Sequence, residues 1–188
     1  AAAQAPTTRP SPLLQSVPAR IPPPDAAFRA AFDAANRGTL DDLALAGFAT
    51  HPLAGWLEYA ALRSRLDTLP VARGNAFLAR RQGEPVATLF RAVWLAALAR
   101  RNEWQAFLNQ WDDTIDAAML RCLRLQALMA MNRADAAWTA AAQALWRSSG
   151  RSLPAQCDAP FALLVAQGGL TDALRWERFD KAADAGQA

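Results

Sequence analysis

Apolar residues recur at helical spacing along nearly the whole chain after residue 24. The period is clearest in residues 115–131, "IDAAMLRCLRLQALMAM", where Cys122 and Leu125 share one apolar stripe. Leu120 and Leu123 make other sides of this helix apolar as well, which indicates that it is covered on more than one side. No segment alternates at period two for long enough to form a strand. The pattern therefore predicts an all-α protein.

Turn and capping residues divide this pattern into ten expected helices. Asp25, Thr39 and Thr171 are expected N-caps, Thr114 opens the long seventh helix, and Gly38 suits the left-handed position after the first. Pro52 fits the first turn of the third helix. The expected helices span about 26–37, 40–48, 51–66, 71–82, 86–100, 103–111, 115–131 and 134–150, then one from 157 or 158, and 172–185.

Similar turns restart the helical pattern at Asn102, Asn132 and Gly168, which lie 30 and 36 residues apart. This is the period of two helices and two turns, and one helix pair cannot bury its apolar face alone. We therefore predict a right-handed superhelix, an α-solenoid of stacked helical hairpins that is tetratricopeptide-like but less regular. A helical bundle without superhelical stacking is the alternative.

Residues 1–24 differ from the rest, because seven of the 12 prolines fall there. Proline at this density favours an extended or disordered segment, so we expect a superhelical domain over 25–188 preceded by this segment. The segment is not itself a signal peptide, but its start, "AAAQA", is typical of a mature chain after signal removal. No apolar run is long enough to span a membrane.

The net charge is only +3, yet 19 of the 20 basic residues are arginine. Arginine suits acidic partners, although GC-rich coding would also favour it. Arg80-Arg81 and Arg100-Arg101 could mark a nucleic-acid surface, but the charge is modest and Trp94 falls on a packing face. We expect a solvated face and no nucleic-acid partner.

The residues that could carry chemistry are few. His51 is the single histidine, and Cys122 and Cys157 lie 35 residues apart, which does not match zinc spacing. Cys122 lies within an apolar stripe and His51 precedes a proline at a helix start, so a Cys–His catalytic pair is not expected. Gly168-Gly169 has no preceding strand and no following lysine, so it is a turn and not a phosphate loop. We expect no catalytic, cofactor or metal site.

Three carboxylates, Asp112, Asp113 and Asp116, cluster before and within the expected first turn of the seventh helix. Negative charge there complements the helix dipole, so we expect them to cap this helix.

Two stretches resemble the N-terminal region of the periplasmic soluble lytic transglycosylases. "HPLAGWLEYAALRSRL", from His51, is similar to a "PL–x–x–[aromatic]–LEY" helix of that family. From Cys122 onward, the order of an Ala-Trp helix, a Leu-Trp ending, a second cysteine and a glycine also matches. Asn132 replaces a family glycine, and Leu163 or Leu164 replaces an aromatic residue. The resemblance covers about residues 25–188.

The resemblance implies a curved, U-shaped superhelix that forms part of a ring with a separate lysozyme-like catalytic domain. That domain cleaves the MurNAc–GlcNAc β-1,4 bond of peptidoglycan with formation of a 1,6-anhydro ring, using a glutamate in a Glu-Ser context. No Glu-Ser dipeptide occurs here, and no glutamate of this chain matches that motif: Glu58, Glu84, Glu103 and Glu177. The end of the chain, "DAGQA", looks like another repeat turn, so we expect a truncated domain and an inactive chain.

The expected function is therefore that of a non-catalytic superhelical region that builds the ring and helps to hold peptidoglycan. Its expected partners are peptidoglycan, bound weakly, and its own C-terminal catalytic domain, in the periplasm after signal removal. A stand-alone tetratricopeptide-like module that binds a protein partner is the alternative.

Cys122 and Cys157 form an even pair, which suits an oxidising compartment. They fall in the first helices of neighbouring hairpins, which pack side by side, so a disulfide between them is expected. Two buried free thiols in a cytosolic solenoid remain the alternative.

Overall fold

The computed structural model describes residues 25–186. The expected extended segment, 1–24, lies outside these residues. The described part is helical and holds no strand, as the pattern predicts. Its helices are α1 (Ala26–Asn36), α2 (Asp42–Ala46), α3 (Ala54–Arg63), α4 (Val71–Arg80), α5 (Pro85–Arg100), α6 (Trp104–Asn109), α7 (Ala118–Ala130), α8 (Ala136–Arg147), the 3-10 helix η1 (Ala155–Cys157), α9 (Asp158–Ala166) and α10 (Asp172–Asp184).

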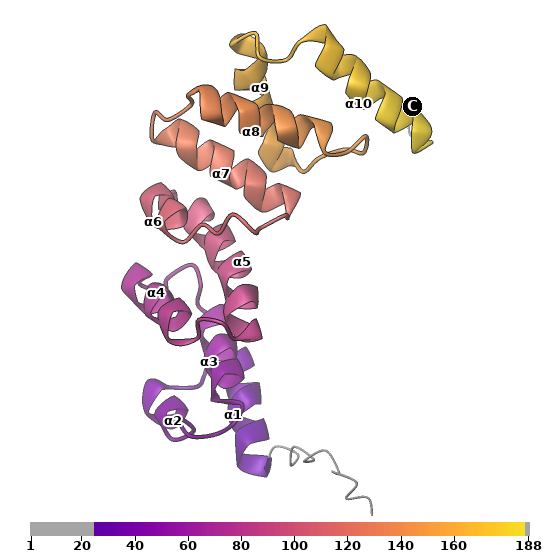
Figure 1. The fold of residues 1–188 in the computed structure, drawn as a ribbon. Coiled ribbons are helices and arrows are strands. Elements are labelled where there is room, and N and C mark those ends of the chain that lie inside the picture. Colours follow the sequence, from indigo (N-terminus) through magenta and orange to yellow (C-terminus); the bar gives the residue numbers. More distant parts are fainter. Residues whose placement is uncertain (1–24, 187–188) are drawn as a thin grey trace, which may run out of the picture.

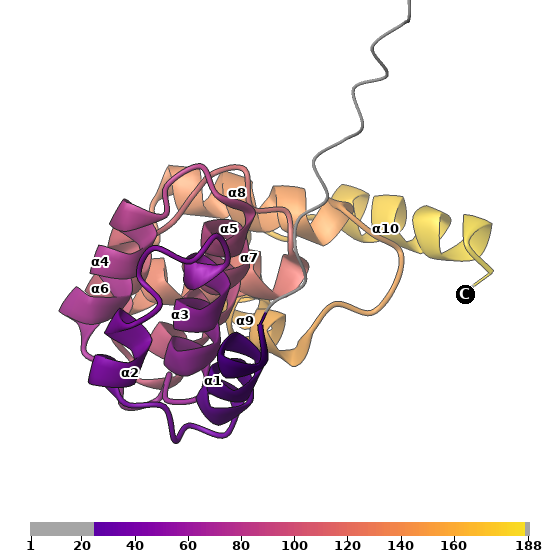
Figure 2. The same cartoon turned by 90° about the horizontal axis from the view of Figure 1, so that it is seen from below.

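The helices stack in chain order from α1 at one end to α9 and α10 at the other (Figure 1). The odd-numbered helices from α1 to α9 contact one another in succession. The even-numbered helices flank them, with α4 on α5, α6 between α5 and α7, and α10 against α8. Figure 2 looks along the stack and shows α10 extending away from the other helices. The predicted α-solenoid is thereby confirmed.

The core follows the stack as three successive apolar clusters. The first includes Phe28 and Leu57 of α1 and α3, the second surrounds Trp94 of α5, and the third surrounds Trp138 of α8. Trp94 is 0% exposed and Trp138 1% exposed. No polar or charged side chain within the described residues is buried. The clusters bridge neighbouring hairpins, so each hairpin depends on the next for its burial.

Helices α5, α7 and α9 end in the same way. Asn102 and Asn132 each have φ of 56° and Gly168 has φ of 70°, all in the left-handed region. At each site two backbone N–H groups turn back to the helix: that of Asn102 reaches the carbonyl of Ala99, and that of Glu103 reaches Leu98. This Schellman geometry satisfies carbonyls that the helix end leaves free. The repeated turn read from the sequence is thus one repeated helix terminator.

Several helix starts differ from those expected. Asp25 and Thr171 cap α1 and α10 as predicted, but the carboxylate of Asp41, and not Thr39, caps α2. Helix α3 begins at Ala54, so Pro52 lies in the preceding turn. Helix α7 begins at Ala118 and not after Thr114, and residues 110–117 form a loop with a turn at residues 113–114.

Gly74 marks the closest approach of two helices in the second cluster. A Cβ atom built on Gly74 of α4 would lie 2.5 Å from Cε2 of the Trp94 indole on α5. Trp94 is wholly buried and its indole N–H donates to Asn75 Oδ1 at 3.3 Å, so the ring cannot move away freely. Glycine at this position therefore sets how closely α4 packs on α5.

We predict that Gly74→Ala destabilises the protein although alanine is the better helix former. Overpacking costs about 1–3 kcal/mol, against ~1 kcal/mol gained from helix propensity. The measurement is urea unfolding followed by circular dichroism. As a control, Gly74→Ala should lower the free energy of unfolding by less in a Trp94→Phe background, because the smaller side chain lacks the part of the indole that the new Cβ would meet. Equal costs in both backgrounds would contradict this account.

Candidate functional site

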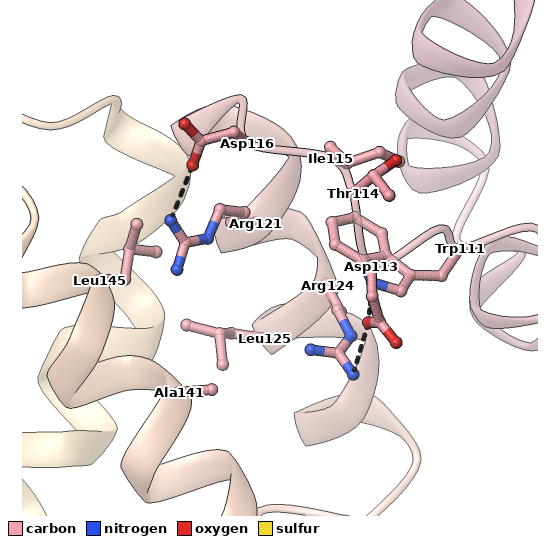
Figure 3. A pocket seen from close by; sticks show the side chains of 10 residues that line it. All are labelled: Trp111, Asp113, Thr114, Ile115, Asp116, Arg121, Arg124, Leu125, Ala141 and Leu145. Atoms are coloured by element: carbon pink, nitrogen blue, oxygen red, sulfur yellow. Dashed lines mark hydrogen bonds and ion pairs between the residues drawn. The ribbon is translucent and has the colours of Figure 1, made fainter. Parts of the chain in front are cut away.

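A cavity of about 400 Å³ opens between the loop at residues 110–117 and helices α7 and α8 (Figure 3). We call it the α7 pocket. Its walls combine charged, aromatic and apolar side chains: Trp111, Asp113, Thr114, Ile115, Asp116, Arg121, Arg124, Leu125, Ala141 and Leu145.

The apolar part of the α7 pocket belongs to the third core cluster. Leu125 of α7 and Leu145 of α8 are 2% and 1% exposed, and Ala141 of α8 packs against the same cluster. Because these side chains are held by the core, this part of the pocket has a fixed shape.

The polar part of the pocket carries two arginines, one turn apart on α7, that point into it (Figure 3). Arg121 donates to Asp116 Oδ1 at 3.2 Å, and Arg124 Nη2 lies 3.8 Å from Asp113 Oδ1. The arginine side chains are 32% and 36% exposed, whereas Asp116 and Asp113 are 96% and 88% exposed. The guanidinium groups thus sit in the pocket while their carboxylates stand in solvent.

Trp111 contacts both Arg124 and Asp113 at the pocket. The guanidinium carbon of Arg124 lies 5.2 Å from the centre of the Trp111 ring, within cation–π range. The indole N–H of Trp111 donates to Asp113 Oδ1 at 2.9 Å. One aromatic side chain therefore orients both members of the Arg124–Asp113 pair.

The expected capping role of the three aspartates is wrong. Ala117 is the N-cap of α7, and no acidic residue lies in its first turn. Asp112 instead accepts hydrogen bonds from the backbone N–H and hydroxyl of Thr114, at 2.9 and 2.6 Å. These bonds, with further help from Arg91 of α5, hold the pKa of Asp112 below its ordinary value. Asp113 and Asp116 belong to the α7 pocket.

The α7 pocket offers binding groups and not an acid–base pair. Two guanidinium groups beside an apolar wall can hold a carboxylate or another planar anion. Asp113 and Asp116 are almost wholly exposed, whereas a carboxyl that acts as a general acid is ordinarily desolvated. Sequence reasoning missed this pocket, although Trp111 and the i, i+3 arginines on one helix face were visible signals.

The structure keeps the other candidate residues apart. His51 lies in the turn before α3, where its Nδ1 accepts from the N–H of Leu53 at 3.1 Å and its ring stacks on Phe28. His51 belongs to the first-cluster end of the stack and Cys122 to the third cluster, so the two do not meet. His51 is therefore a turn residue ahead of α3, which begins at Ala54.

Each glutamate has an arginine beside it. Glu58 pairs with Arg80 and Arg81, and the remaining pairs are Glu84 with Arg81, Glu103 with Arg101 and Glu177 with Arg147. Arg100 likewise pairs with Asp67, at 2.6 Å. The arginine doublets are therefore engaged with carboxylates along the surface.

Cys122 of α7 and Cys157 of η1 lie at disulfide distance, with their Cα atoms 4.9 Å apart. Both are buried in the third cluster, at 0% and 1% exposure. The stacking of neighbouring hairpins brings them together, as expected from the predicted architecture.

Within residues 25–186 no group of three or more His, Cys, Asp or Glu side chains is placed to hold a metal ion. Over the same residues no helix is both long and apolar enough to cross a membrane.

Comparisons with known proteins point to one family. The chain is 27% identical over 140 residues to a soluble lytic murein transglycosylase of Salmonella typhimurium, a match that covers 74% of this chain and 21% of the relative. Its fold is similar to that of an inactive mutant of the lytic transglycosylase of Pseudomonas aeruginosa, with a TM-score of 0.73, 27% identity, and coverage of 87% of this chain and 26% of that one.

The structure of the 70-kDa soluble lytic transglycosylase of Escherichia coli gives a TM-score of 0.75 at 23% identity, over 85% of this chain and 26% of that one, and supports the fold alone. No family model matches. The matched part spans about a fifth of the length of the curated relative, 21%. The family resemblance seen in the sequence is confirmed by these likenesses.

We predict that Cys122 and Cys157 are joined by a disulfide when the protein matures in an oxidising compartment. Closing this loop should stabilise the fold by roughly 3–4 kcal/mol in the chain-entropy model. Mass spectrometry after denaturation and alkylation without reductant should find no modified thiol, and two after reduction. A Cys122→Ala, Cys157→Ala variant should unfold at lower urea concentration and lose its response to reductant. Two alkylated thiols without reductant would sink the prediction.

Proposed function

We propose that this chain, a relative of the soluble lytic murein transglycosylases, is a non-catalytic superhelical module that holds peptidoglycan for a catalytic domain. That domain would cleave the MurNAc–GlcNAc β-1,4 bond with formation of the 1,6-anhydro product. The module comprises residues 25–188, preceded by a separate Pro-rich segment over 1–24. It would build the ring together with the catalytic domain, in the periplasm after removal of a signal peptide.

The coverage of the comparison carries this proposal. The match takes 74% of this chain but only 21% of a relative named as a soluble lytic murein transglycosylase. The chain therefore corresponds to one part of such a protein. No Glu-Ser dipeptide occurs in its sequence, and its four glutamates each lie beside an arginine on the helical stack. These features support a holding role for this part and leave the acid–base chemistry to another.

Charge supports the choice of ligand. Of 20 basic residues 19 are arginine, and the peptide moieties of peptidoglycan carry carboxylates. Arg121 and Arg124 in the α7 pocket are the pair whose carboxylate partners are most exposed and therefore most easily exchanged. The Cys122–Cys157 pair at disulfide distance is consistent with an oxidising compartment.

A stand-alone tetratricopeptide-like interaction module is the second candidate. Trp176 and Phe179 on α10 favour it, because they are 64% and 53% exposed and their rings lie 5.6 Å apart. An exposed aromatic pair is typical of protein interfaces. The reading frame after Ala188 distinguishes the candidates: a lysozyme-like domain with a Glu-Ser motif supports the first, and a stop codon supports the second.

We predict that the purified chain releases no anhydro-muropeptides from peptidoglycan. The physical reason is the missing acid–base glutamate, without which the glycosidic oxygen is not protonated. The measurement is chromatography of the soluble products after incubation with sacculi, with a boiled sample as the control. Anhydro products above that control would overturn the non-catalytic assignment.

We also predict that sacculi retain the chain weakly and that salt releases it. Attraction between arginines and carboxylates is screened within ~10 Å at 0.1 M salt, so retention measured by sedimentation should fall as salt rises. Retention that high salt leaves unchanged would contradict an electrostatic contact. No retention at low salt would mean that this region does not hold peptidoglycan.

A further inference from the structure

We propose that the α7 pocket binds a free carboxylate of a peptidoglycan stem peptide, with Arg121 and Arg124 as the binding pair. This inference rests on the proposed function and names the peptide, not the glycan strand, as the part that the module holds. Three observations carry it: the two arginines have unused N–H donors, their orientation is fixed, and Arg124 lies over the Trp111 ring.

Both arginines retain donors for a ligand. Arg124 donates no hydrogen bond to any residue in the described part, and the nearest carboxylate oxygen is 3.8 Å away. Arg121 donates a single bond, to Asp116 at 3.2 Å. A guanidinium presents five N–H donors in a planar fork that matches a carboxylate. Two such forks one turn apart on α7 can reach a carboxylate placed between them.

The guanidinium groups are also held ready. The guanidinium carbon of Arg124 lies 5.2 Å from the centre of the Trp111 ring. The side chain of Leu125, which follows Arg124 on α7, is fixed in the core. The present partners, Asp113 and Asp116, are 88% and 96% exposed, so exchanging either for a ligand carboxylate requires little rearrangement. In each ion pair the arginine lies in the pocket, and its aspartate partner can be replaced by the carboxylate of a ligand.

The Trp111 ring decides between peptide and glycan. Sugar rings commonly bind by stacking on an exposed aromatic face, and Arg124 already lies over this ring. The wall formed by Leu125, Ala141 and Leu145 accepts a small apolar group beside the carboxylate, such as the methyl group of an alanine residue. A cavity of about 400 Å³ has room for the end of a peptide. The pocket therefore matches a carboxylate with a small apolar neighbour.

The test is titration calorimetry of the full 188-residue chain with three probes. These are the stem pentapeptide ending in D-Ala-D-Ala, the same peptide with its carboxyl groups amidated, and a tetramer of N-acetylglucosamine. We expect the free peptide to bind with a dissociation constant of about 1 mM. The amidated peptide should bind at least tenfold more weakly, and the sugar tetramer should not compete with the free peptide.

Variants assign the binding to the pocket. Arg121→Gln and Arg124→Gln together should weaken binding of the free peptide at least tenfold, whereas Arg133→Gln, outside the pocket, should leave that binding unchanged. Asp113→Asn together with Asp116→Asn should tighten binding of the free peptide severalfold, because the carboxylates that compete for the arginines are gone. This gain cannot arise from a misfolded protein. An unchanged dissociation constant in both double variants would overturn the inference.

The two proposals fail separately. Retention on sacculi without binding of the free peptide overturns the pocket assignment and leaves the holding function intact. Peptide binding that depends on both arginines, without retention on sacculi, supports the pocket and overturns the holding function. Equal binding of the free and amidated peptides overturns carboxylate recognition even where sacculi retain the chain.

Discussion

Every hairpin of this protein depends on its neighbour to bury the apolar face that it cannot cover alone. The contacts run from α1 to α3, α5, α7 and α9, and the large buried side chains lie where these helices meet. Trp94 and Trp138 fill two of these junctions, and Gly74 allows α4 to approach the first. Because burial is shared between neighbours, no helix pair has a core of its own, and changes at one junction should affect the adjacent pairs most.

The spacing of the stack follows from how the helices end. Asn102, Asn132 and Gly168 all adopt positive φ and turn the chain by the same pair of backbone hydrogen bonds. A recurring terminator was readable from the sequence because few residues tolerate this conformation, and Asn and Gly are the usual ones. The helices between terminators were readable for a similar local reason, since apolar residues recur at the helical period. Architecture could thus be predicted well.

The loop at residues 110–117 could not be predicted, and the candidate site was missed with it. Ile115 continues the apolar period of α7, and the aspartates around it, two before and one after, imitate the first turn of a helix. In the structure, hydrogen bonds from Thr114 and an ion pair to Arg91 of α5 engage Asp112 in a turn, so α7 begins at Ala118. A contact across 21 residues overrides the local pattern. Trp111, Asp113 and Asp116 become pocket walls for this reason.

Helix α7 has a buried face in the third cluster and a charged face at the α7 pocket. No charged residue within residues 25–186 is buried as a whole, so the arginines lie at the surface or only partly buried. Helix α7 nevertheless carries Arg121 next to Cys122, which lies against Cys157 in the third cluster. The same helix is therefore anchored to the next hairpin by a core cysteine and presents two guanidinium groups to the α7 pocket. A rigid support beneath exchangeable surface pairs is what a module needs if it holds a charged ligand without acting on it.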